Sequence, residues 1–313
     1  MTHKYYALIF LIFTFGVKPV QAEGTGGLSG SFLRMGSSAR AIAMGSALTA
    51  DSNNEAAIYY NPAGLSWVDR LSFNATNQFL SLNRKLSIVD LAIKIPPGAG
   101  VGIMWVHAGV DEIDGRDTDG QHTEMYSANE DALYIGFAKN LNARIHLGIT
   151  LKILQHQLPT ATNRLQGSGV GFDLGFLYQL KPDISLGLVI QNIKTSYQWS
   201  NQTYVNQEHV YKDQFPTDVR LGVNYLWRTW QFIGDAGITI FNKKTIDHEF
   251  RFGIEYIYNN NFFARVGFQG NNPTMGLGYQ YSLIGDNDSS INYALVLESV
   301  TNPTHVISYV FNL

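Results

Sequence analysis

The sequence predicts an all-β protein, a 14-stranded antiparallel up-and-down transmembrane β-barrel with a small N-terminal helical plug (hatch). Three observations lead to this fold class. Apolar and polar residues alternate through most of the chain, the connections between the alternating segments sort by length, and the segment before the first of them is rich in small residues. Alternation is the pattern of a strand with two unlike faces.

Residues 1–22 are expected to form a secretory signal peptide that is cleaved after export. The stretch YYALIFLIFTFGV is an apolar core of about a dozen residues, whereas a membrane-spanning helix needs about 20. The small residues of VQA, ending at Ala22, suit a cleavage site. The alternative is a retained membrane anchor. With cleavage, the mature chain begins near Glu23, outside the cytoplasm.

Residues 71–313 carry the alternation and are expected to form the barrel. In RIHLGITLKI, for example, every second residue from Ile145 to Ile153 is apolar. We count about 14 such segments, most of them about ten residues long, which suits a tilted strand that crosses a bilayer. Segments 86–95 and 231–241 alternate less cleanly. The segments start near residues 71, 86, 100, 131, 144, 167, 184, 216, 231, 248, 262, 275, 290 and 304.

The connections fall into two sets by parity. Five short ones (PPGA, KNLNA, QLKPD, WRT and NNN) alternate with a set that holds two loops of about 20 residues, Val110–Glu130 and Lys194–Phe215. Short periplasmic turns and longer outer loops are typical of an outer-membrane barrel. The final stretch HVISYVFNL resembles the C-terminal recognition strand of such barrels. A secreted β-sandwich or propeller is the alternative, but its strands would be shorter.

Residues 23–70 do not alternate. Phe32–Ala50 is rich in Ala, Gly and Ser, and Asn53 or Asn54 is a candidate N-cap for a short helix through Tyr60. Pro62 then forces Asn61 out of the helical region, and Gly64 permits a turn into the first strand. Small side chains would let this segment pack closely against the wall of a barrel that is otherwise wide enough to leave a hole.

Charged residues in the plug and on the inferred lumen face are candidates for holding the plug in place. Enclosed charges must be compensated, so Arg40 and Asp51 are expected to pair with lumen groups; the alternative is that both are solvated. The mixed signs on the lumen face favour a salt-bridged interior over a selectivity ring, with simple wet-face polarity as the alternative. The lumen candidates are Asp173, Asp218, Arg220, Glu249, Arg251, Glu255 and Arg265.

Other chemistries find little support. The loop Asp111–His122 places Asp117 and Asp119 in a weakly calcium-like arrangement without the distal Glu of an EF-hand, so a solvated loop is favoured and no metal is expected. No catalytic motif is present, and we expect neither an enzyme nor a cofactor, although a barrel esterase could hide Ser and His on neighbouring strands. The chain has no Cys, and a formal net charge of −3 without a basic cluster argues against nucleic acid.

One sequence signature is similar to that of a known family. Its residues are Ala39-Arg40-Ala41, Met44-Gly45, Ala47, Ala50-Asp51 and Tyr60-Asn61-Pro62-Ala63-Gly64-Leu65. They resemble the N-terminal signature of the FadL-type superfamily of long-chain fatty acid transport proteins, and within it the PorV/PorQ family most. Ser46 and Ser52 depart conservatively from the family pattern.

The resemblance implies a barrel in the bacterial outer membrane whose N-terminal segment folds inward as a hatch. PorV/PorQ-type proteins support type IX protein secretion, so secreted cargo or secretion-system proteins would be partners together with outer-membrane lipid. FadL-type channels instead take up fatty acids or other hydrophobic compounds and release them sideways. We therefore expect secretion support, with hydrophobic transport as the alternative. Transport predicts apolar inward-facing residues near the outer rim and a kinked strand beside the hatch; secretion predicts large, ordered outer loops with an apolar surface.

Overall fold

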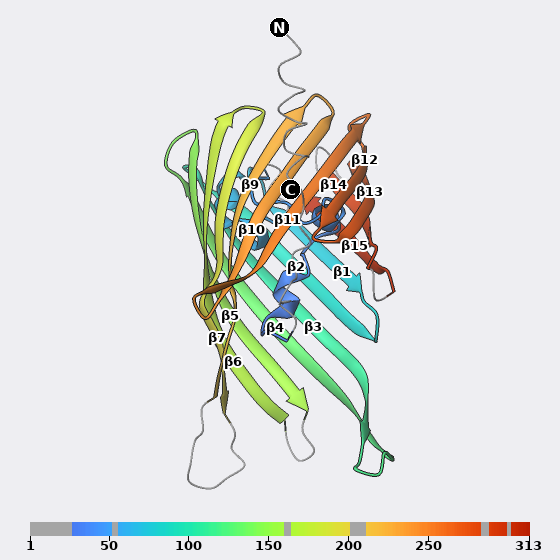
Figure 1. Ribbon diagram of the computed structural model, residues 1–313. Coiled ribbons are helices and arrows are strands. Elements are labelled where there is room, and N and C mark those ends of the chain that lie inside the picture. Colours follow the sequence, from blue (N-terminus) through green and yellow to red (C-terminus); the bar gives the residue numbers. More distant parts are fainter. Residues whose placement is uncertain (1–26, 52–55, 160–163, 201–210, 283–287, 299–301) are drawn as a thin grey trace.

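The computed structural model is a β-barrel with short helices inside it (Figure 1). It describes residues 27–51, 56–159, 164–200, 211–282, 288–298 and 302–313. The predicted signal peptide 1–22 and the candidate caps Asn53 and Asn54 lie outside the described residues. The helical segments are η1 (Ser31–Arg34), α2 (Ala39–Ala43), α3 (Ala57–Tyr60) and η2 (Pro62–Trp67). No helix among the described residues is both long and apolar enough to cross a membrane.

The strands follow the hatch in the order of the sequence. They are β1 (Ser72–Phe79), β2 (Arg84–Ile95), β3 (Ala99–Arg116), β4 (His122–Asn140), β5 (Ile145–Pro159), β6 (Arg164–Lys181), β7 (Ile184–Ser200), β8 (Tyr211–Gln214), β9 (Thr217–Trp227), β10 (Trp230–Phe241), β11 (Lys244–Tyr258), β12 (Phe262–Gln269), β13 (Asn272–Ser282), β14 (Asp288–Val296) and β15 (Thr304–Asn312).

The sheet closes on itself through antiparallel pairs. β1 pairs with β15, and β6 pairs with β7, so the first and last strands meet in the wall. β9 pairs with β7 over Ile184–Gln191, and the short β8 pairs with β7 over Ser196–Trp199. β8 and β9 therefore share one position, and the described strands form a barrel of 14 strand positions. The predicted fold class is confirmed.

Alternation in the sequence becomes two faces of the wall. On β5, Leu147, Ile149 and Ile153 point outward and are between 40% and 45% exposed. Their neighbours on the same strand, Thr150 and Lys152, are buried in the lumen. An apolar outer face is what a barrel in lipid requires. The hydrophobic core lies inside, between the hatch and the inner faces of β2 to β5.

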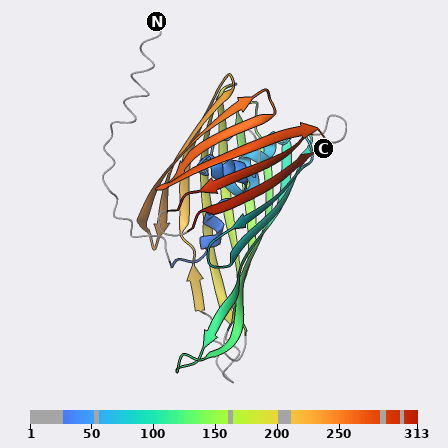
Figure 2. The same cartoon turned by 90° about the vertical axis from the view of Figure 1, so that its right-hand side faces the viewer.

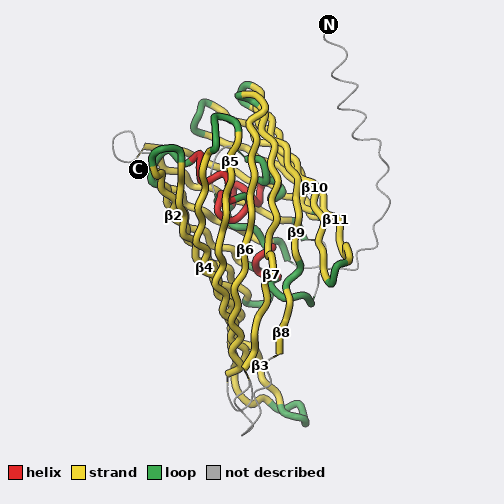
Figure 3. Tube along the Cα trace, turned by 90° about the vertical axis from the view of Figure 1, so that its left-hand side faces the viewer, coloured by secondary structure: helices red, strands yellow, loops and turns green. Residues whose placement is uncertain are grey.

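The wall is much taller on one side than on the other. β3 to β7 are 15 to 19 residues long, whereas β12 has 8 residues. Their far ends extend beyond the rest of the barrel on the side of the β3–β4 connection, which we call the long-loop end (Figures 1–3). The opposite end, where β1 begins and the chain ends, is the short-turn end.

The prediction that Val110–Glu130 and Lys194–Phe215 are long loops is wrong, because most of their described residues lie in strands. Most of Val110–Glu130 belongs to β3 and β4, which stay paired as far as Arg116 and His122 across two register shifts. Most of the described part of Lys194–Phe215 likewise belongs to β7 and β8. The predicted length of about ten residues is also wrong for β3 to β7. Beyond the bilayer both faces of a strand can be polar, so alternation stops although the hydrogen-bonded ladder continues.

The described parts of the hatch, residues 30–51 and 56–68, run through the lumen and are almost wholly buried. Ser38 caps α2 by accepting a hydrogen bond from the Ala41 backbone N–H at 3.1 Å. Asn61 takes an extended conformation and ends α3, as its position before Pro62 predicts. The expected turn at Gly64 is wrong: Pro62 starts the 3₁₀ helix η2, and Gly64 lies within it.

Candidate functional site: the hatch, its buried charges and a kinked strand

Glycines on the inner wall set how closely the hatch approaches the strands. Eight of them form four cross-strand pairs, and each pair faces a different part of the hatch. A β-carbon on Gly253 would lie 2.5 Å from the Met44 carbonyl oxygen, and one on Gly187 would overlap the backbone at Thr49. At these two positions backbone packs on backbone, whereas Gly102 and Gly136 face the side chains of Leu65 and Ile58. Neither kind of contact leaves room for a ligand. The pairs are Gly102–Gly136, Gly148–Gly175, Gly187–Gly222 and Gly253–Gly267.

The segment Asn61-Pro62-Ala63-Gly64 seats the hatch against β5 and β6. The Asn61 side-chain oxygen accepts from the Ala63 N–H at 3.2 Å. Its amide nitrogen donates to the carbonyl oxygens of Thr49 at 2.7 Å and Phe176 at 3.1 Å, the latter on β6. One side chain thus caps η2, ties two parts of the hatch together and joins the hatch to the wall.

Arg40 is the centre of a buried charge network that joins the hatch to β10, β11 and β12. Its side chain is 2% exposed, and its guanidinium lies 2.7 Å from Asp51 and 3.3 Å from Glu255. It also donates to the Gln231 side chain at 2.9 Å. Arg265 contacts the same Glu255 at 2.5 Å. Two arginines and two carboxylates therefore neutralise one another where water is scarce.

The remaining lumen candidates fall into separate groups. Arg251 pairs with Glu249 at 2.6 Å and donates to the Ser46 carbonyl oxygen at 3.2 Å, which ties β11 to the hatch. Asp218 and Arg220 are 3.9 Å apart on β9. Asp173 lies away from both, beside Lys152 on β5.

Further hatch contacts come from predicted and unpredicted residues. Gly45 has φ 64°, and its N–H donates to the Thr274 hydroxyl at 3.2 Å. Asp235, which was not predicted, accepts from the Thr49 N–H at 3.1 Å and hydroxyl at 2.7 Å. Asp235 and Gln231 lie in the segment that alternates less cleanly. Lys152 lies in the segment 144–153, which alternates cleanly. Its position on the polar face of that segment indicates that it points into the lumen.

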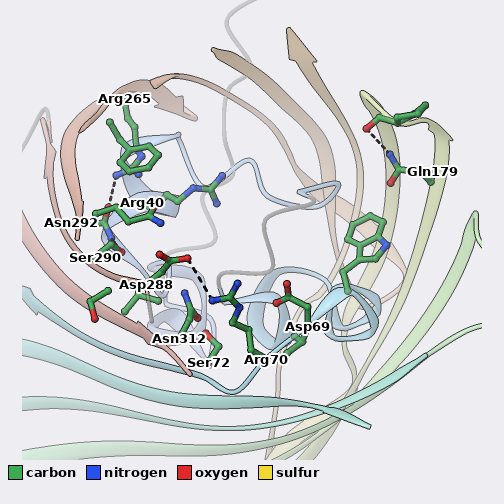
Figure 4. Close-up of a pocket in the computed structure, with 17 residues that line it drawn as sticks. Arg40, Asp69, Arg70, Ser72, Gln179, Arg265, Asp288, Ser290, Asn292 and Asn312 are labelled. Carbon is green, nitrogen blue, oxygen red and sulfur yellow. Dashed lines mark hydrogen bonds and ion pairs between the residues drawn. The ribbon is translucent and has the colours of Figure 1, made fainter. Parts of the chain in front are cut away.

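A polar cavity of about 640 Å³ lies where the hatch joins the wall at the short-turn end (Figure 4). Arg40 and Arg265 reach it from inside, and Arg70 pairs with Asp288 across it at 3.7 Å. The hydroxyl of Ser289, which also lines it, is buried without a hydrogen-bond partner among the described residues. Such a lining suits water and polar groups and is a poor environment for a hydrophobic compound.

Strand β7 is kinked beside the hatch. Its pairing with β6 shifts register twice, between Val170 and Leu174, so that β7 carries two extra residues there. Asn192 and Lys194 have φ values of 58° and 51°, in the left-handed region. The ladder with β9 ends at Gln191, and the ladder with β8 resumes at Ser196. Irregular pairing of this kind bends a strand and interrupts its ladder.

An apolar cluster lies inside the barrel next to this kink, toward the long-loop end. The rings of Tyr197 and Phe215 meet edge to face at 5.0 Å, and Trp199 lies 5.1 Å from His156. Phe32 and Leu33 of η1 belong to the same core. Both features that the transport hypothesis expects are therefore present: apolar inward-facing residues near this rim, and a kinked strand beside the hatch.

The acidic loop Asp111–His122 uses its carboxylates locally. Asp117 accepts from the N–H groups of Asp119 at 3.0 Å and Gln121 at 2.8 Å, which forms a tight turn. Asp114 lies 2.6 Å from His122 and 2.7 Å from Arg116. Within the described ranges, no group of three or more His, Cys, Asp or Glu residues is placed to hold a metal ion.

Comparison with known proteins finds relatives in structure alone. No protein-family model matches the sequence, and no curated protein matches it. The Pseudomonas putida toluene transporter TodX superposes with a TM-score of 0.61 at 14% identity, covering 88% of this chain and 97% of TodX. The Ralstonia pickettii toluene transporter TbuX gives 0.62 at 15%, covering 89% and 98%. A Pseudomonas aeruginosa FadL homologue gives 0.54 at 10%, covering 88% and 95%.

At these identities the likeness is one of fold. The chain has the FadL/TodX-type 14-stranded barrel with N-terminal helical segments, as the broader resemblance implied. The narrower resemblance to PorV/PorQ proteins receives no support from these structures. TodX and TbuX are transporters, and CymD is a monoaromatic hydrocarbon channel.

Proposed function

We propose that this protein is a bacterial outer-membrane channel for small hydrophobic compounds and that these compounds leave it sideways through the wall. The observation that carries the proposal is the interrupted ladder between β7 and the β8/β9 strand, which lies beside both the hatch and the apolar cluster. A hydrophobic compound gains free energy by passing from an apolar site directly into lipid.

A route straight through the hatch is disfavoured by three features described above. At the four glycine pairs the wall leaves no space beside the hatch. The Arg40 network would have to be broken, and separating one partner from a buried ion pair costs about 3–5 kcal/mol. Beyond the hatch lies the polar cavity, which an apolar compound would enter at a cost. Sideways release avoids all three.

The substrate class follows from the site and from the proteins that share the fold. The cluster around Tyr197 and Phe215 offers aromatic faces, which pack well against flat apolar molecules. Proteins of this fold include transporters for toluene and a channel for monoaromatic hydrocarbons. Monoaromatic compounds are therefore the first ligands to test, and long-chain fatty acids the second.

Secretion support of the PorV/PorQ type is the competing function. It expects large, ordered outer loops with an apolar surface. The described tip of the β3–β4 hairpin instead carries the charged run from Asp111 to Asp119. Transport of hydrophobic compounds is therefore the main proposal, and secretion support is the alternative.

The test uses the purified protein in liposomes, with radiolabelled toluene and oleate as probes. Faster uptake than in protein-free liposomes is expected. Because the chain has no Cys, a Thr49→Cys/Asp235→Cys pair can lock the hatch to β10 through a disulfide, checked by thiol titration. Uptake should survive the lock. Uptake that stops on oxidation and returns on reduction contradicts sideways release. Absence of uptake, together with secreted proteins co-purifying from the native host, favours secretion support.

A further inference from the structure

Three polar side chains meet inside the wall where β7 bends. Lys152 on β5, Asp173 on β6 and Asn192 on β7 come from three neighbouring strands, and all three are buried. The Lys152 ammonium lies 2.8 Å from the Asp173 carboxylate and donates to the Asn192 side-chain oxygen at 2.7 Å. The same Asp173 oxygen accepts from the backbone N–H of Asn192 at 2.8 Å.

The contact to the Asn192 backbone is made at the point where β7 leaves its regular course. Asn192 is the first residue of β7 beyond the ladder with β9, and its φ of 58° is one that non-glycine residues seldom adopt. An N–H that loses its strand partner inside a wall must find another acceptor. The Asp173 carboxylate supplies that acceptor.

The neighbouring strand is shaped to receive the bulge. Gly169 and Gly171 of β6 face the bulged part of β7: a β-carbon on either would overlap Ser196 or Thr195. The bulged backbone therefore occupies space that side chains would fill in a regular barrel. Beyond the bulge, the Phe215 N–H donates to the Thr195 carbonyl oxygen at 3.0 Å, which starts the ladder again.

A charge pair at this depth needs a reason beyond stability. Both side chains are at most 2% exposed, and well-packed apolar residues in place of a buried ion pair are often equally stable. This pair differs from a simple strand-to-strand bridge because it reaches a third strand and holds that strand by its backbone. The Lys152 ammonium also lies 5.0 Å from the centre of the Tyr134 ring, which helps to compensate the charge.

We infer that Lys152, Asp173 and Asn192 form a clamp that holds β7 in its bulged course and so keeps its ladder with the β8/β9 strand interrupted. This inference rests on the proposed function in one respect: the interrupted ladder between β7 and the β8/β9 strand is taken to be the side exit. The three residues are positioning residues: they act through the backbone of β7. Without the clamp, β7 is free to shift and to pair with its neighbour, since unpaired backbone groups in a membrane are costly.

The test compares two double variants that remove the same charges. Lys152→Met/Asp173→Asn keeps an oxygen for the Asn192 N–H, whereas Lys152→Met/Asp173→Leu removes it. Spin labels on cysteines at the exposed positions Gln198 of β7 and Leu221 of β9 report the distance across the interruption by pulsed electron resonance. A second label pair, at Leu221 and Leu277, does not involve β7 and serves as reference. Gel mobility without boiling confirms that each variant forms a barrel.

Lys152→Met/Asp173→Asn (the Asn variant) is expected to keep the wild-type distance between labels at 198 and 221. Lys152→Met/Asp173→Leu (the Leu variant) is expected to show a shifted or broadened distance distribution. The reference distance stays unchanged in both. Glu249→Leu/Arg251→Met, which removes a partly buried ion pair on β11, should leave the 198–221 distance as it is. Identical distributions in wild type and Leu variant overturn the clamp. Equal disturbance by both double variants also overturns it, because the hydrogen bond from the Asn192 N–H to the side chain at position 173 would then not hold β7.

Uptake by the same proteins separates the clamp from the proposed function. Toluene uptake per folded barrel should fall about tenfold in the Leu variant, a ratio that corresponds to ~1.4 kcal/mol. Wild-type protein that carries no hydrophobic compound, combined with a shifted distance in the Leu variant, supports the clamp and contradicts the channel. Wild-type uptake combined with an unchanged distance supports the channel and contradicts the clamp.

Discussion

Arg40→Met tests whether the buried charges hold the hatch in the barrel. The substitution keeps much of the side chain's apolar length and removes the guanidinium that contacts Asp51, Glu255 and Gln231. Glu255 retains Arg265 at 2.5 Å, but Asp51 keeps, among the described residues, the Gln231 amide at 2.9 Å as its remaining side-chain donor. The main loss is therefore one carboxylate left buried without its cation.

Such a loss costs about 3–5 kcal/mol of unfolding free energy. Arg70→Met is the matched control, because Arg70 lines the same cavity but its pair with Asp288 is 3.7 Å long and about 40% exposed. That pair is worth ~0.2–1 kcal/mol. The assay follows the folded fraction in urea by gel mobility without boiling, and midpoints convert to free energies through the common slope. If the two variants lose the same free energy, the Arg40 network does not hold the hatch.

Three further outcomes are expected. Gly253→Ala should destabilise the barrel by about 1–3 kcal/mol in the same urea assay, because the new β-carbon would meet the Met44 carbonyl oxygen. Gly234→Ala is the control, because the nearest atom to its β-carbon would be 3.7 Å away, and it should not destabilise the barrel. Equal effects of the two substitutions would contradict close seating of the hatch. Asn61→Ala should cost about 1 kcal/mol or more through the lost cap of η2, measured the same way, whereas an unchanged midpoint would refute its seating role. Mass spectrometry of the mature protein should give an N-terminus at Glu23; a retained Met1 would contradict the signal peptide.

Lipid explains why the barrel was predictable. Each strand that crosses the bilayer must show apolar residues outward, so alternating runs such as Val219 to Tyr225 indicate both the strand and its facing. The same logic stops at the rim: from Gln155 onward, β5 is polar outward, and the strand extension left no pattern to detect. The sequence therefore predicts shorter strands with long loops where the structure has tall strands.

The candidate site was predictable in its members more than in its arrangement. Arg40 and Asp51 stood out as charges in a small-residue segment, and the structure places them together. Glu255 joins them because of the way the hatch is seated against the wall. The alternation of apolar and polar residues carries no information about that position. The kink is harder still, because Asn192 and Lys194 are ordinary residues with left-handed φ values, and the contacts of Asn192 to β5 and β6 exist only in the folded barrel.

The glycine pairs have a consequence for how the protein is assembled. Hatch backbone lies against wall backbone at Gly100, Gly148, Gly187 and Gly253, spread over much of the circumference. A finished cylinder offers no clearance through which this segment could slide into place. We therefore expect the strands to close around a hatch that is already inside. The N-terminal segment then acts as a template around which the strands close. Deletion of residues 27–68 should therefore impair barrel closure itself.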